Sequence, residues 1–103
     1  MNDIQRIAQH YGLFHQLKKL QEELDELWDQ AENARCDINV TKDHILPKTL
    51  DALVDELADV SVMLQQIMHL TNTHDAVRER IQFKVNRQLE RIAVEANNEQ
   101  PDN

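Results

Sequence analysis

The scarcity of residues that interrupt helices constrains the fold of this chain more than any other feature. The 103 residues include one glycine and two prolines. These two residue types are the least favourable in a helix interior, whereas the abundant Leu, Glu, Gln, Ala, Lys and Arg propagate helices well. The β-branched residues are scattered and form no alternating run typical of a strand. We therefore predict a single all-α domain.

Apolar periodicity places two helices in the first half of the chain. The first is short, with Asn2 or Asp3 as its N-cap and Gly12 ending it in a left-handed conformation. The second runs from about residue 13 to about residue 35 and is followed by a polar stretch, residues 37–46, which predicts a loop. Its apolar stripe is Leu13, Leu17, Leu20, Leu24, Leu27, Trp28 and Ala31.

Two further helices are predicted in the second half. Pro47 suits the first turn of the third helix, where its missing N–H costs nothing. Thr73 follows a break in the pattern and is a plausible N-cap for the fourth helix. The third helix carries the apolar stripe Leu50, Leu53, Val54, Leu57, Val60, Leu64, Ile67 and Met68. We expect a domain over residues 1–96 and a disordered polar tail over 97–103.

These elements predict a four-helix bundle-type protomer. Its two long central helices should pack antiparallel, because a short loop joins them. Hydrophobic residues make up 41% of the chain and aromatic residues only 4%, so the core is thin and an oligomer would bury more surface.

Charge and composition exclude several classes of protein. The net charge of −8 argues against nucleic-acid binding, which needs a basic face. Cys36 is the only cysteine, so no intrachain disulfide is expected. No N-terminal signal pattern is present, and no apolar run approaches the roughly 20 residues of a membrane helix. We therefore expect a cytoplasmic protein without membrane association.

Two acidic pairs stand out on the central helices, Glu23 with Glu26 and Glu56 with Asp59. Residues three apart share a helix face. At ~100° per residue, Glu23 and Glu26 lie ~80° and ~140° from their apolar stripe. Glu56 and Asp59 lie ~90° and ~150° from theirs, in the same rotational sense. If the two helices pack antiparallel with their apolar stripes facing each other, residues at equal angles from the stripes lie on the same side of the helix pair. The four carboxylates should therefore lie close together.

Clustered carboxylates suit Mg²⁺, a hard cation that prefers oxygen ligands and binds substrate phosphates. Glu22 points away from the stripe, which indicates an outer or supporting position. The alternative is that these acidic residues are ordinary solvated helix positions. Basic residues on the fourth helix, among them Lys84 and Arg87, could bind phosphate oxygens or form surface ion pairs. Lys19 could act in the same way or pair with Glu23.

These residues resemble the motifs of the MazG-like, all-α nucleoside triphosphate pyrophosphohydrolases, especially the small single-domain members common in phages and prophages. That pattern is Glu-Glu-x-x-Glu, then Glu-x-x-Asp, then a later segment with Lys and Asn. Here it reads Glu22-Glu23-Leu24-Asp25-Glu26, then Glu56-Leu57-Ala58-Asp59, then Lys84-Val85-Asn86-Arg87. The spacing between the acidic motifs is slightly long, and Asp25 stands where the family often has a small residue.

The resemblance implies hydrolysis of ribo- or deoxyribonucleoside triphosphates to the monophosphate and pyrophosphate. It implies Mg²⁺, with Mn²⁺ as a substitute, and a homodimer or homotetramer. Glu23, Glu26, Glu56 and Asp59 would be the metal ligands, and Glu22 would support them. Lys84, Asn86 and Arg87 would hold phosphate or sugar. Glu23 and Glu26 are both candidates for the general base that accepts a proton from water.

Two other functions stay open. One is hydrolysis of phosphoribosyl-ATP by a related enzyme with the same helix architecture. The other is a non-catalytic helical interaction protein that retains the fold. Tyr11, Phe14 and Trp28 could stack on a base, but we expect core packing for Phe14 and Trp28.

Overall fold

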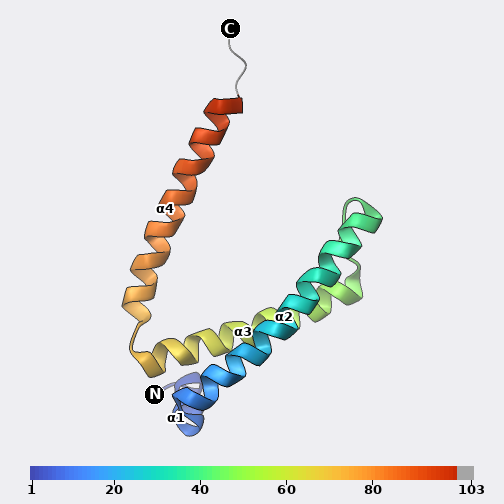
Figure 1. Ribbon diagram of the computed structural model, residues 1–103. Helices are drawn as coiled ribbons and strands as arrows, with labels where there is room; N and C mark the ends of the chain where they lie inside the picture. Colours follow the sequence, from blue (N-terminus) through green and yellow to red (C-terminus); the bar gives the residue numbers. More distant parts are fainter. Residues whose placement is uncertain (100–103) are drawn as a thin grey trace. The chain divides into compact units, whose positions relative to one another are not determined.

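The computed structural model describes residues 1–99, and within this range the chain forms four helices and no strand (Figure 1). The helices are α1 (Asp3–Tyr11), α2 (Leu13–Thr41), α3 (Pro47–Thr71) and α4 (His74–Glu99). The all-α prediction is therefore confirmed. Met1–Asn72 form one compact unit that holds α1, α2 and α3, and a second unit begins at Thr73 and holds α4.

Helix α1 begins and ends where its sequence predicts. The Asn2 side chain accepts a hydrogen bond from the Gln5 N–H at 2.8 Å, and the Gln5 side chain accepts one from the Asn2 N–H at 3.2 Å. This reciprocal pair is a capping box, which satisfies two donors at the helix start. Gly12 ends the helix with φ 83° and ψ 167°, a positive φ that favours glycine but lies outside the left-handed helical region.

The loop predicted over residues 37–46 was too long, because α2 continues to Thr41. Lys42 ends the helix with a φ of 74°, and its N–H donates to the Ile38 carbonyl at 2.7 Å. Ile38 and Val40 are exposed, so this last stretch has no buried face and no apolar period marks it as helical. The Asp37 side chain accepts from the Leu46 N–H at 3.1 Å and so ties the helix end to the start of α3.

Helices α2 and α3 form an antiparallel pair joined by a short loop, and α1 packs on both (Figure 1). The buried apolar side chains are few, as the thin predicted core implies: Ala8, Ala34, Val60 and Met63. The predicted stripe-to-stripe packing was wrong in detail. Leu17, Leu24 and Trp28 are exposed, and the buried residues of α2 are Gln16, Glu23 and Ala34.

Core packing of Phe14 and Trp28 was also a wrong prediction for the protomer. Phe14 is 88% exposed and Trp28 70% exposed. Both lie on faces of α2 that turn away from the contacts with α1 and α3, although their spacing fits an apolar helix face.

Helix α4 is described by itself. It begins directly after Thr73, as predicted, and the Val77 N–H donates to the Thr73 carbonyl at 2.9 Å. Residues 97–99 belong to this helix, so that part of the predicted disordered tail was wrong, and residues 100–103 lie outside the described residues. No described side chain of α4 is buried. The bundle of four helices stays a prediction.

Among the described residues, none of the helices combines the length and apolarity needed to cross a membrane.

Candidate metal centre

The antiparallel pairing of α2 and α3 brings four carboxylates together. Glu23 and Glu26 come from α2, and Glu56 and Asp59 from α3. One carboxylate oxygen of each residue lies within 4.8 Å of the corresponding oxygens of the others. These are the four residues that the acidic pairs in the sequence select as a cluster.

The cluster lies deeper than the helix angles predict. Glu23 is only 6% exposed and Glu56 is half-buried, whereas Glu26 and Asp59 are exposed. The sequence-based estimate assumed that the leucine stripes face each other, which leaves Glu23 on the flank. In the structure α2 turns its Gln16, Glu23 and Ala34 face inwards, so Glu23 lies within the helix contact itself.

Burial leaves two carboxylate oxygens without a hydrogen bond. Among the described residues, Glu23 Oε2 and Glu56 Oε2 are inaccessible to solvent and have no hydrogen-bond partner. A buried, unsatisfied polar atom costs free energy, and a charged one costs more. The position therefore fits a ligand that supplies positive charge to these oxygens.

The electrostatics of the cluster disfavour ionisation. Burial raises the pKa of Glu56, and the negative charges of Glu26 and Asp59 raise it further. Asp59 is exposed, but partial loss of solvation beside the helix contact and the charge of Glu23 likewise raise its pKa. Four carboxylates this close repel one another when ionised, so the site favours protons or cations.

Lys19 supplies the one cationic side chain that contacts the cluster among the described residues of α2 and α3. Its Nζ lies 3.2 Å from Glu23 and 3.7 Å from Glu22. The hydrogen bond to Glu23 and that residue's charge raise the pKa of Lys19. One ammonium group offsets only part of the charge of four carboxylates, and the donor set of oxygens is the one that Mg²⁺ and Mn²⁺ prefer. The residues therefore fit a hard divalent cation.

Glu22 lies where a supporting residue would be expected. It is exposed, and its contact with Lys19 connects it to the edge of the cluster. Its role in binding a ligand stays a prediction.

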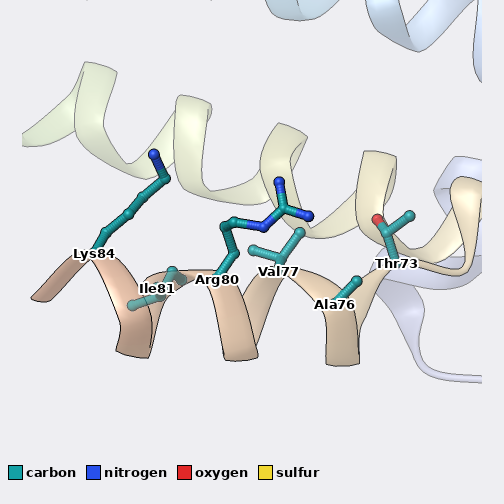
Figure 2. Close-up of a pocket in the computed structure, with 6 residues that line it drawn as sticks. All are labelled: Thr73, Ala76, Val77, Arg80, Ile81 and Lys84. Carbon is teal, nitrogen blue, oxygen red and sulfur yellow. The ribbon is translucent and has the colours of Figure 1, made fainter. Parts of the chain in front are cut away.

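The predicted phosphate-binding residues Lys84, Asn86 and Arg87 all lie on α4, in the second unit. Asn86 accepts a hydrogen bond from Gln82 at 3.1 Å. Figure 2 shows Lys84 and Arg80 extending from α4 beside Val77 and Ile81, where these residues line a shallow hollow of about 410 Å³. Their relation to the carboxylates stays a prediction.

Sequence reasoning missed a polar pair next to the cluster. Gln16 of α2 and Gln66 of α3 are 3% and 2% exposed, and Gln16 Nε2 donates to Gln66 Oε1. A signal for them exists, because residues seven apart lie on nearly the same helix face. Gln16 precedes Glu23 by seven positions and Gln66 follows Asp59 by seven, so the two glutamines extend the acidic face.

No protein-family model, no curated protein and no solved structure matches this chain. The case for a function therefore depends on the residues and their geometry.

Proposed function

We propose that this chain is a Mg²⁺-dependent pyrophosphohydrolase of ribo- or deoxyribonucleoside triphosphates, similar to the MazG-like all-α enzymes. The observation that carries the proposal is the convergence of Glu23, Glu26, Glu56 and Asp59 within 4.8 Å. The two acidic pairs on consecutive helices resemble the motif of that family, and their distance in the folded chain suits one shared ligand.

The residues of the cluster would hold Mg²⁺ through their carboxylate oxygens. A bound divalent cation supplies positive charge that offsets the charge of the triphosphate oxygens. That charge also answers the question of how a chain with a net charge of −8 attracts an anionic substrate.

The chain's own residues would orient the substrate and accept a proton. In the hydrolysis, the oxygen of water forms a bond to phosphorus while the bond to the pyrophosphate leaving group breaks. A carboxylate takes the proton that the water loses. Glu23 and Glu26 both stay candidates for this role. Lys19, which lies at the edge of the cluster, would contact phosphate oxygens with its ammonium group.

A homo-oligomer belongs to the same proposal. The apolar residues of α2 and α3 that a protomer leaves exposed include Leu24, Trp28, Val54 and Leu57. Several large apolar side chains exposed on two adjoining helices favour a contact with another protein surface. A second copy would cover these side chains and complete the core, as a homodimer or a homotetramer.

The test is a pyrophosphate-release assay. Purified protein is incubated with ribo- and deoxyribonucleoside triphosphates and with phosphoribosyl-ATP, with and without Mg²⁺, and pyrophosphate is measured against inorganic phosphate. We expect Mg²⁺-dependent pyrophosphate release from free nucleotides that is lost in Glu56→Gln. Asp51→Asn is the matched control, because it removes an exposed carboxylate of α3 outside the cluster.

Two results would count against the proposal. Turnover of phosphoribosyl-ATP alone would assign the chain to the related enzyme. The absence of turnover on every substrate, with no effect of Mg²⁺ on the melting temperature, would favour the non-catalytic interaction protein.

A further inference from the structure

A hollow of about 620 Å³ lies beside the carboxylate cluster, within the unit formed by α1, α2 and α3. Tyr11 of α1, His15 and Gln16 of α2, and Gln66 of α3 line it. Its size falls in the range of small-molecule sites, which is about 300–1,000 Å³. Lys19 also lines the hollow while it contacts Glu23, so the hollow and the cluster adjoin.

Three residues that line the hollow form a directed chain of hydrogen bonds. Gln16 Oε1 lies 2.7 Å from His15 Nδ1, and Gln16 Nε2 donates to Gln66 Oε1. Since a Gln oxygen only accepts, the bond from His15 uses that oxygen and leaves the Gln16 nitrogen for Gln66. The Gln66 oxygen is therefore occupied, and the group of Gln66 that stays available is its Nε2 donor.

The cost of burying two amides suggests that this arrangement has a use. Gln16 and Gln66 are each at least nine-tenths buried, in a protomer whose core otherwise holds few side chains. An apolar pair would fill the same space without the cost of removing amides from water. An amide donor in the lining of a hollow can select a ligand that carries a hydrogen-bond acceptor.

A stacked pair of aromatic rings also lines the hollow. The rings of Tyr11 and His15 are stacked, with centroids 4.7 Å apart and an interplanar angle of 17°. Tyr11 is 51% exposed, so the stacked pair retains accessible ring surface. A planar ligand gains stacking energy on such a surface.

We propose that this hollow binds the base of the nucleotide and selects bases that carry a ring carbonyl. The base stacks on an outer ring face of the Tyr11–His15 pair, and its carbonyl oxygen accepts a hydrogen bond from Gln66 Nε2. Uracil, thymine, cytosine and guanine carry such an oxygen and adenine does not. The inference rests on the proposed function, because it assigns the part of the substrate that extends beyond the phosphates.

Binding of nucleoside monophosphates tests the inference without any turnover. Titrations of UMP, CMP, GMP and AMP into metal-free protein give affinities, and saturation-transfer NMR reports whether base protons contact the protein. We expect UMP, CMP and GMP to bind more tightly than AMP, with saturation of their base protons. Gln66→Glu keeps the oxygen that Gln16 uses and replaces the donor by an acceptor.

In that variant, the affinities for UMP, CMP and GMP should fall by about tenfold or more, since a donor–acceptor pair is lost. The affinity for AMP should change much less. Gln65→Glu is the matched control, because it adds the same charge at the neighbouring exposed position and should change all four ligands little and equally. Tyr11→Ala, at a half-exposed position, should lower the affinities for all four monophosphates. It provides a second test if Gln66→Glu does not fold.

Equal affinities for the four monophosphates, or no detectable binding of any, would overturn the inference. So would unchanged affinities in Gln66→Glu and Tyr11→Ala. Pyrophosphate release that persists in these variants with an unchanged base preference would overturn it while leaving the proposed function intact. Selective binding of the monophosphates by a protein that releases no pyrophosphate would support the base site and overturn the proposed function.

Discussion

Glu56 shows how one residue can lower stability and serve a ligand. Its carboxylate is half-buried, one of its oxygens has no hydrogen-bond partner among the described residues, and Glu26 and Asp59 lie beside it. Each of these features disfavours the ionised side chain in the folded protein. A side chain in such a position is expected where a ligand compensates the cost.

Glu56→Gln should therefore stabilise the metal-free protein while it removes the response to metal. We expect the melting temperature without Mg²⁺ to rise by a few degrees, because repulsion within the cluster falls. Added Mg²⁺ should raise the melting temperature of the wild type, since a ligand of the folded state stabilises it, but should leave the variant nearly unchanged. Differential scanning fluorimetry with and without Mg²⁺ measures both effects. A metal-free variant that melts below the wild type would contradict the account of repulsion.

Removal of the positive charge of Lys19 should have the opposite effect, because Lys19 offsets negative charge at the cluster. Its ammonium group lies 3.2 Å from the buried Glu23. Lys19→Met should lower the melting temperature of the metal-free protein, since a buried charge that loses its partner is destabilising. The loss should shrink when Mg²⁺ is added.

Lys18→Met is the matched control for that measurement. Lys18 is exposed and forms no ion pair among the described residues, so its replacement should change the melting temperature little with or without Mg²⁺. An equal effect of both substitutions would indicate a general response to net charge.

At the scale of the elements, the junction between α1 and α2 depends on Gly12. Its φ of 83° and ψ of 167° lie in a region that only glycine adopts readily. Apart from the two residues adjacent to Gly12, no atom lies within 4 Å of the position that an added Cβ would take, so crowding is not the constraint. The conformation turns the chain so that α1 can pack on both α2 and α3.

Gly12→Ala should lower the free energy of unfolding by about 1–3 kcal/mol through backbone strain alone. Gly12→Asn should cost a similar amount, because Asn tolerates the left-handed helical region but not this one. Asn72, with φ 53° and ψ 48°, lies in that tolerated region, so Asn72→Gly should be close to neutral. Urea unfolding followed by circular dichroism measures all three. A neutral Gly12→Ala would show that the junction can relax.

At the scale of the whole molecule, the unit formed by α1, α2 and α3 leaves several large apolar side chains exposed. Leu24, Trp28, Val54 and Leu57 are exposed on α2 and α3. A chain of 103 residues buries a modest share of its surface when it folds alone. Association with further copies is the simplest way to remove these side chains from water.

We therefore expect a mass in solution of two or four times 12.1 kDa, measured by light scattering after size-exclusion chromatography. Trp28→Glu should shift the mass towards that of the protomer, because it places a charge in the contact. Val40→Glu should not, although Val40 is also exposed, since it lies near the end of α2. A wild-type mass of 12.1 kDa at every concentration would contradict the oligomer.

The sequence by itself determined the local features of this protein. The scarcity of glycine and proline favours long helices. Asn2 and Gly12 mark the two ends of α1, and Pro47 marks the start of α3. Periodicity also paired Glu23 with Glu26 and Glu56 with Asp59, because the spacing of residues on a helix is a local property. The meeting of the two pairs depends in addition on the antiparallel packing of α2 and α3.

The tertiary structure alone decided which helix face turns inwards. That choice depends on how three helices fill space together, so the leucine stripe that dominates the pattern of α2 does not predict it. It placed Glu23 within the helix contact and joined Gln16 to Gln66 across it. The end of α2 at Thr41 is also known only from the structure, because the exposed residues there carry no apolar period.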